Sequence, residues 1–306
     1  MAHSPEHHAG RPGPAGVWSN FDRLPAHEVT AFAQRAEARG YDAIWTQETA
    51  GRDPFALLGT LAAHTTRIRL GVGIAVIYGR DPVAMHAGAA TVHELSGGRM
   101  LLGVGASHRD TVSEVRGHEY RGPFSAMRDY LDGYESAAYR APLPHGRPPL
   151  VLAALRRRML ELAATRTDGA FPYLVPVDYV GRARETLDAA APAGRDRPLL
   201  IVSAACVLQT QAGAARRAAH RYLERYLGLP NYLNNLRESG FTDADLARPG
   251  SDRLVDALVA WGDAGTVRAR LRAYLDAGAD HVALIPLTAE GAMADLATME
   301  ALAPPW

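Results

Sequence analysis

The chain has 306 residues, 47% of them hydrophobic, and its 33 basic and 33 acidic residues give a formal net charge of +0. This balance provides no electrostatic attraction toward nucleic acid or an anionic membrane surface. All 33 basic residues are arginine, which excludes, in their usual form, Schiff-base and pyridoxal-phosphate chemistry and the lysine-containing phosphate loop.

The first 14 residues are expected to form a disordered tail, since residues 1–15 lack the cationic start and the apolar centre of a signal peptide. No apolar run approaches the roughly 18 residues that a transmembrane helix needs. The single cysteine, Cys206, lies in an apolar run and is expected to be a buried structural thiol. These features predict a cytoplasmic protein with one domain over residues 15–306.

Short apolar runs alternate with helical patterns along that domain, which indicates buried parallel strands in βαβ units. The expected strands are 15–19, 41–46, 68–77, 100–106, 150–154, 169–174, 199–208 and 281–286. The expected helices are 25–39, 53–64, 81–95, 125–139, 156–165, 177–191, 213–227, 266–277 and a closing helix that ends at 302.

Eight strands alternating with helices predict a (β/α)8 TIM barrel. A doubly wound Rossmann sheet is the alternative, but Gly71-Val72-Gly73 and Gly103-Val104-Gly105 lack the third glycine and the spacing of a dinucleotide fingerprint. Two polar insertions, at 107–124 and 228–250, follow the fourth and seventh strands. Because barrel active sites lie at the carboxyl ends of the strands, either insertion could cover the site.

Several short motifs occur in a fixed order between about residues 15 and 290: GYDAIW at 40–45, IRLGVGI at 68–74, RDP at 80–82, LSGGR at 95–99, LGVG at 102–105, SH at 107–108 and AGADHV at 277–282. In this order and spacing the chain resembles the luciferase-like family of barrel oxidoreductases, specifically its branch that uses the deazaflavin coenzyme F420. The resemblance implies hydride transfer between C5 of F420 and a small organic substrate.

Two other functions stay open. The same fold serves two-component monooxygenases, which use FMN and O2 and need a partner reductase. A non-catalytic flavin- or deazaflavin-binding protein is the other alternative, since a fold does not guarantee its function. The resemblance also implies a homodimer, and an F420 or flavin reductase that supplies reduced cofactor.

The resemblance places the cofactor ring in the barrel mouth and its phosphate near strand-end loops and helix starts, where N–H groups and the helix dipole attract anions. It also implies a bulge in the third strand, often with a non-prolyl cis peptide, although the glycines there could merely relieve packing. Trp45 could instead fill the barrel, and the arginines could be surface charge. The cofactor-binding residues expected are Trp45, Gly73, Ile74, Ala75, Gly105, Ser107, Leu155, Arg156 and Arg157, with Arg158 beside them.

The catalytic positions depart from the family pattern. F420-dependent sugar-phosphate and alcohol dehydrogenases of the family carry an acid-histidine pair after the second strand and a glutamate after the fourth. Here Thr49 stands at the histidine position and Ala106 at the glutamate position, so a dehydrogenase of that exact kind is not expected. The remaining acid/base candidates are His108, an imidazole just past a strand, and Glu48, which could instead cap a helix or pair with Arg52. A metal site is not expected, because no HExxH or clustered Cys/His spacing occurs.

Overall fold

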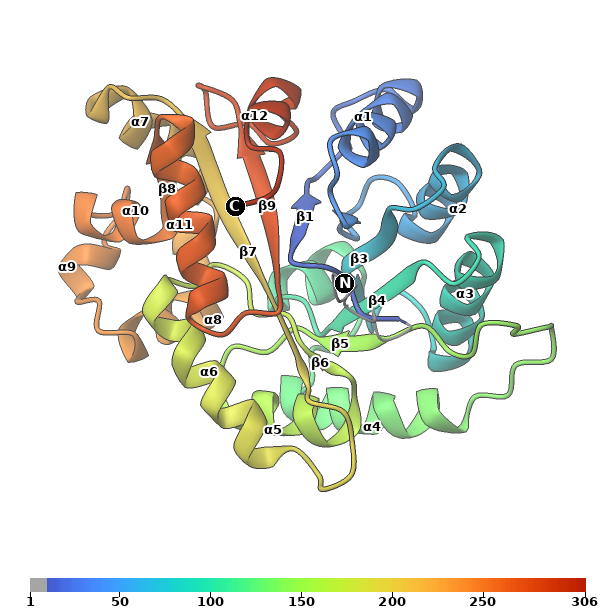
Figure 1. Cartoon of the computed structure of the whole chain (residues 1–306). Coiled ribbons are helices and arrows are strands. Elements are labelled where there is room, and N and C mark those ends of the chain that lie inside the picture. Colours follow the sequence, from blue (N-terminus) through green and yellow to red (C-terminus); the bar gives the residue numbers. More distant parts are fainter. Residues whose placement is uncertain (1–9) are drawn as a thin grey trace.

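The computed structural model describes residues 10–306, whose strands form a closed parallel barrel (Figure 1). The barrel strands are β1 (Ala15–Trp18), β2 (Ala43–Thr46), β3 (Arg69–Val76), β4 (Met100–Gly105), β5 (Leu150–Leu152), β6 (Gly169–Ala170), β7 (Leu199–Leu208) and β9 (His281–Leu287). Each strand pairs in parallel with the next in this order, and β9 closes the ring on β1. The predicted (β/α)8 barrel is confirmed.

Helices follow the strands and surround the barrel (Figure 1). They are α1 (Ala26–Ala38), α2 (Pro54–His64), α3 (Pro82–Leu95), α4 (Pro123–Ser136), α5 (Arg157–Arg166), α6 (Val177–Ala190), α7 (Ala212–Leu223), α11 (Ala264–Asp276) and α12 (Leu296–Ala301). The starts of α2 and α3 were predictable from sequence, because an Asp-Pro pair begins each. Asp53 and Asp81 accept hydrogen bonds from first-turn N–H groups, and the proline that follows has no N–H to leave unpaired.

The barrel interior is filled near the amino ends of the strands by Trp45 of β2 and His281 of β9, neither of which is exposed to solvent. The indole Nε1 of Trp45 donates to Nε2 of His281 over 3.0 Å. Two glycines make room for these rings: a Cβ at Gly16 would lie 2.3 Å from the imidazole, and one at Gly71 would lie 2.2 Å from the indole. A buried apolar layer between the strands and the surrounding helices completes the core.

The structure adds one strand that the sequence analysis missed. Helix α10 (Asp252–Leu258) leads directly into β8 (Val259–Gly262), which pairs with the carboxyl half of β7. The amino end of β7 pairs with β6 instead. Helix α10 and strand β8 are short and have no turn residues between them. Each is therefore too short for its hydrophobic periodicity to be recognised in the sequence.

Other differences lie at element ends. The predicted strand 169–174 is reduced to β6, since Pro172 has no N–H for a ladder and Leu174 has a left-handed φ of 59°. The predicted helix 213–227 ends with α7 at Leu223 and is followed by a separate 3-10 turn, η2 (Tyr226–Gly228).

Both predicted insertions contain helices. Residues 107–124 include a π-helical turn, η1 (Thr111–Val115), and residues 228–250 include α8 (Pro230–Glu238) and α9 (Asp243–Leu246). Cys206 is buried and free, as predicted. No helix within residues 10–306 is long and apolar enough to span a bilayer.

Residues 1–9 of the predicted tail lie outside the described residues. Residues 10–14 contact the amino end of the barrel: the carbonyl of Gly13 accepts from His281 Nδ1, and the carbonyl of Pro14 accepts from the N–H of Val282. Arg11 lies 3.6 Å from Asp280. The packed part of the described chain therefore begins before Ala15.

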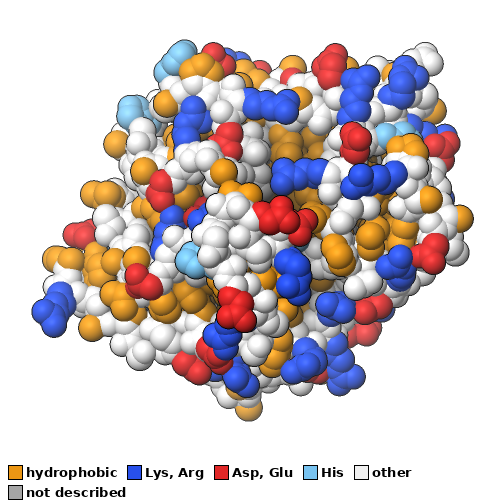
Figure 2. Space-filling model, turned by 180° about the vertical axis from the view of Figure 1, so that it is seen from behind, with side chains coloured by type: hydrophobic (Ala, Val, Ile, Leu, Met, Phe, Trp, Pro, Cys, Tyr) orange, Lys and Arg blue, Asp and Glu red, His pale blue; other side chains and the backbone are white. Residues whose placement is uncertain are grey.

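Charges of both signs are interspersed on the face shown in Figure 2. Arginines there alternate with aspartates and glutamates, in keeping with the formal net charge of +0. This face therefore presents no patch of one sign.

Candidate functional site

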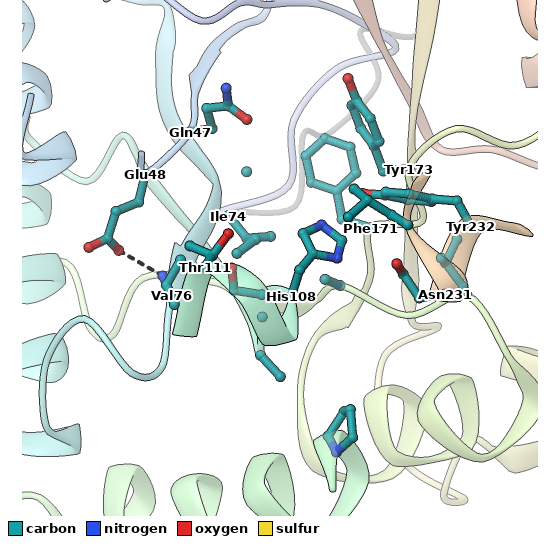
Figure 3. Close-up of a pocket in the computed structure, with 18 of the residues that line it drawn as sticks. Gln47, Glu48, Ile74, Val76, His108, Thr111, Phe171, Tyr173, Asn231 and Tyr232 are labelled. Atoms are coloured by element: carbon teal, nitrogen blue, oxygen red, sulfur yellow. Dashed lines mark hydrogen bonds between the residues drawn. The ribbon is translucent and has the colours of Figure 1, made fainter. Parts of the chain in front are cut away.

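A cavity of about 620 Å³ lies at the carboxyl ends of the barrel strands. Its walls come from the ends of β1 to β6, from the 107–124 insertion around η1, and from η2 with the start of α8. The residues of one wall face those of the other across the cavity in Figure 3. This position agrees with the rule that barrel active sites are built on loops at the carboxyl ends of the strands.

The predicted bulge in β3 is present. The register between β3 and β4 shifts between Val72 and Ala75, and the Gly73–Ile74 peptide bond is cis. Ile74 projects from the bulge into the cavity (Figure 3). Two glycines of β4 make room for it, since a Cβ at Gly103 would lie 3.3 Å, and one at Gly105 2.9 Å, from the Ile74 side chain. The β4 glycines therefore serve packing against the bulge.

Glu48 holds this bulge from the end of β2. Its backbone N–H donates to the carbonyl of Ile74 over 3.1 Å, and its Oε2 accepts from the N–H of Val76 over 2.7 Å (Figure 3). The carboxylate also pairs with Arg80 at 2.9 Å and with Arg116 at 3.0 Å, and only 5% of the side chain is exposed. Both carboxylate oxygens are thus engaged with donors. This arrangement suits a structural anion better than a proton donor.

His108 lies just past β4 and lines the cavity. The preceding residue, Ser107, has a left-handed φ of 59°, which is uncommon for a residue other than glycine. The imidazole lies against the ring of Tyr232, with 5.5 Å between centroids, and interacts with the Asn231 side chain. Burial lowers the pKa of His108 below its ordinary 6.5, and the charge of Arg225 acts in the same direction, whereas Asn231 and Asp110 oppose the shift. The ring is neutral at pH 7.

Aromatic side chains form the wall on the His108 side of the cavity. The hydroxyl of Tyr173, just past β6, is hydrogen-bonded to those of Tyr222 at 2.7 Å and Tyr226 at 2.8 Å. The ring of Tyr226 packs against Tyr232 with 5.6 Å between centroids. Burial raises the pKa of each of these tyrosines, so the four phenols are neutral and the wall is apolar with fixed hydroxyls.

The predicted phosphate segment lies where β5 turns into α5. Leu155 and Arg156 line the cavity, and the Arg156 side chain is exposed and forms no ion pair with any residue between 10 and 306. The side chains of Arg157 and Arg158 contact other residues outside the cavity. Arg157 pairs with Glu161 at 2.8 Å, and the Arg158 guanidinium lies 4.2 Å from the centroid of the Phe124 ring.

The structure brings most of the predicted site residues together. Those that line the cavity are Glu48, Gly73, Ile74, Gly105, Ser107, His108, Leu155 and Arg156. Three other residues predicted to contact the cofactor do not line this cavity. Trp45 is fully buried deeper in the barrel, Ala75 is fully buried on the core side of β3, and the Arg157 side chain points to solvent and to Glu161. Ala75 follows Ile74 in β3, and neighbouring side chains of a strand point to opposite faces, so both could not face the cavity.

Several cavity residues were not predicted as site residues: Trp18, Tyr173, Arg225, Asn231 and Tyr232. Trp18 is the last residue of β1 and Tyr173 lies just past β6, and a position at a strand end was a usable signal. Arg225, Asn231 and Tyr232 lie in or beside the 228–250 insertion, which was expected only to cover the site. Among residues 10–306 no group of three or more His, Cys, Asp or Glu side chains could hold a metal ion.

The family described as luciferase-like monooxygenase matches residues 2–281 of the chain. The chain belongs to this family. Over 299 aligned residues this luciferase-like protein is 25% identical to 5,10-methylenetetrahydromethanopterin reductase of Methanolobus tindarius, with 84% of this chain and 90% of that protein covered.

Solved structures of other proteins share the fold. An F420-dependent secondary alcohol dehydrogenase in complex with an F420-acetone adduct has a TM-score of 0.77 at 13% identity, with 95% of this chain and 97% of that chain covered. The oxygenating constituent of 3,6-diketocamphane monooxygenase from Pseudomonas putida, in complex with FMN, has a TM-score of 0.73 at 17% identity, with 95% and 96% covered. At these identities the likeness concerns the fold alone.

Proposed function

We propose that the chain is an F420-dependent oxidoreductase that transfers a hydride between C5 of the deazaflavin and a small organic substrate. The observation that carries the proposal is the position of His108. It is a neutral imidazole in no ion pair with any described residue, and it lines the cavity that the β3 bulge also enters. The similarity to a methylenetetrahydromethanopterin reductase supports a redox function.

The cavity residues fit such a cofactor. A flat ring needs apolar surface, which Ile74 and the aromatic wall offer, and a phosphate needs cationic and N–H donors. Arg156 lies unpaired, within the described chain, directly before α5, a helix of 10 residues whose amino end offers N–H groups. Arg156 would therefore hold the phosphate, with Leu155 beside it. Gly105 and Ser107 would lie along the ring.

The bound deazaflavin would supply the hydride chemistry, and the protein supplies position and a proton. The neutral imidazole of His108 can accept a proton from a substrate hydroxyl during oxidation and return it during reduction. The Asn231 side chain and the Tyr232 ring keep the imidazole in place. Glu48, as a structural anion, would keep the bulge against which the ring rests.

The test is an equilibrium titration of the purified protein with oxidised F420 and, separately, with FMN, followed by fluorescence. Tight F420 binding with weak FMN binding is expected. Arg156→Gln should weaken F420 binding by about tenfold, because it removes a charge-assisted hydrogen bond. Arg157→Gln is the matched control and should leave the affinity unchanged, since Arg157 pairs with Glu161.

Two outcomes would replace the proposal. A preference for FMN would point to a two-component monooxygenase that uses O2 and a partner reductase. F420 binding without turnover of any substrate would point to a non-catalytic deazaflavin-binding protein. Binding of neither cofactor would remove the cofactor assignment altogether.

We also propose a homodimer and a reductase partner that supplies reduced cofactor, both on the basis of the family. Analytical ultracentrifugation would give the oligomeric state, with a mass near twice 32.9 kDa expected. The predicted cytoplasmic location stays a prediction.

A further inference from the structure

The charges that face the cavity do not cancel. Of the described residues that line it, Glu48 is the only carboxylate, and its charge is already met by Arg80 and Arg116. Two further arginines line the cavity, Arg156 and Arg225, and neither side chain forms an ion pair or hydrogen bond with any described residue. A chamber with two unmatched guanidinium groups is suited to anionic occupants.

Arg225 lies on the aromatic wall and belongs to a different part of the chain from the segment that begins α5. It directly precedes η2, and its guanidinium lies 5.6 Å from the centroid of the Tyr226 ring. It lines the same cavity as His108, and the rings connect the two: Tyr226 packs against Tyr232, which lies against the imidazole. Arg156, by contrast, belongs to the segment that would hold the cofactor phosphate.

The surroundings of Arg225 favour a carboxylate over a phosphate. A phosphate usually takes several donors from a helix start or from a group of cations, whereas η2 has only three residues. One guanidinium fork matches one carboxylate with two parallel hydrogen bonds. The rings of Tyr226 and Tyr232 beside it provide apolar surface for the rest of such a molecule.

We infer that the substrate is a small organic carboxylate with an apolar or aromatic body, whose carboxylate binds Arg225 while its reacting carbon lies near His108. This inference rests on the proposed oxidoreductase function. It assigns Arg225 the role of a specificity-determining residue. A neutral analogue of the same shape would lack the charge-assisted hydrogen bonds to the exposed guanidinium of Arg225 and bind more weakly.

The test compares benzoate with its neutral isostere benzamide as probes of the cavity. Each is titrated against the cofactor-free protein and against protein saturated with F420, with binding followed by the fluorescence of Trp18, which lines the cavity, and by calorimetry. The wild type should bind benzoate about tenfold more tightly than benzamide. Arg225→Gln should abolish that preference and leave benzamide affinity unchanged.

Two matched variants separate the possible causes. Arg217→Gln changes an exposed arginine of α7 that does not line the cavity, and should leave the preference intact. Arg156→Gln should weaken F420 binding without altering the preference for benzoate. If Arg225→Gln failed to fold, it would also lose benzamide binding, and that loss would identify the failure. In that case Arg225→Lys, which keeps the positive charge, is used in its place and should retain part of the preference for benzoate.

Three outcomes would overturn the inference. The wild type could bind benzoate no better than benzamide, the preference could survive in Arg225→Gln, or Arg225→Gln could lose F420 affinity instead, which would assign the arginine to the cofactor. Failure of the proposed function is a separate result. If F420 does not bind the wild type, the benzoate preference of the cofactor-free protein still tests the anion site.

Discussion

At the scale of single residues, His108 and Glu48 show how similar positions acquire different roles. Both follow barrel strands and both line the cavity. Glu48 is surrounded by two arginines and a backbone N–H, which hold it as an anion, whereas His108 has a partly buried, neutral ring in no ion pair with the described residues. Of these two residues, we therefore propose a proton-transfer role for His108 alone.

The first prediction concerns His108→Gln. Turnover of any substrate should fall by about 10²- to 10⁴-fold, the usual contribution of a general acid or base, while F420 affinity stays unchanged. Substrate oxidation needs the neutral imidazole, so its kcat/KM should rise with pH through a pKa below 6.5 and then level off. That inflection should be absent in the variant.

The control for this prediction is His118→Gln, at an exposed histidine in the same insertion that does not line the cavity. It should keep both the rate and the pH profile of the wild type. A His108→Gln variant with wild-type turnover would exclude His108 as the acid/base.

The second prediction concerns Glu48→Gln. The neutral amide can still accept from the N–H of Val76. Arg80 keeps its ion pair with Asp53 at 2.7 Å, but Arg116 loses its anion beside a Glu48 side chain that is only 5% exposed. The free energy of unfolding should fall by about 2–4 kcal/mol.

Urea denaturation would measure this change, with Glu161→Gln as the control. Glu161 forms an exposed ion pair with Arg157, which contributes less than about 1 kcal/mol. Wild-type stability with lost turnover would restore Glu48 as an acid/base candidate.

At the scale of elements, the sequence analysis placed most helices and strands within a few residues of their ends. Proline at a helix start, and glycine or polar residues between apolar runs, indicate where an element begins or ends. These signals are local, because each can be read from four to eight consecutive residues. The differences came where neighbours in space decided the structure. Strand β8 exists because the carboxyl half of β7 needs a partner after β6 has ended.

The third prediction concerns the link between β6 and the α7–η2 segment. Tyr173→Phe removes the hydroxyl that joins those of Tyr222 and Tyr226, both only 5% exposed. Each of these two buried hydroxyls would lose one partner and keep only the other, so the free energy of unfolding should fall by about 1 kcal/mol.

Chemical denaturation would check this value, with Tyr139→Phe as the matched control. The ring of Tyr139 stacks on His86, and its hydroxyl forms no hydrogen bond with a described residue. Equal stability of the two variants would mean that the shared hydroxyl does not hold the aromatic wall together.

At the scale of the whole molecule, His281 joins three parts of the chain at the closed end of the barrel. Its Nδ1–H donates to the carbonyl of Gly13, and its Nε2 accepts from Trp45 Nε1–H. This pattern requires the neutral ring, because a protonated Nε2 would point its hydrogen at the indole N–H. Burial lowers the pKa of His281 from 6.5 to about 4.

The fourth prediction follows from that shift. Between pH 6.5 and 4 the unfolded chain binds a proton at this site that the folded barrel does not, so the free energy of unfolding should decrease as the pH falls through this range. The site should contribute about 3 kcal/mol of this loss by pH 4.

Urea denaturation of the wild type and of His281→Gln at pH 7 and pH 4.5 would test it. The variant should be less stable at pH 7, since it loses packing against Trp45, but its stability should depend less on pH. His27→Gln, at an exposed histidine on α1, should keep the wild-type dependence. An identical pH dependence in all three proteins would refute the assignment to His281.

The sequence by itself determined the barrel class, the order of its eight predicted strands and the helix start at Arg156, because each depends on hydrophobic periodicity or on glycine and proline in the local chain. The bulge near Gly73 was expected from the family resemblance. Only the tertiary structure decided the partners of Glu48, which lie 32 and 68 residues away, and the aromatic wall with Arg225. Side chains far apart in sequence meet where the strands end together. Their contacts, and hence their charge and burial, are properties of the closed barrel.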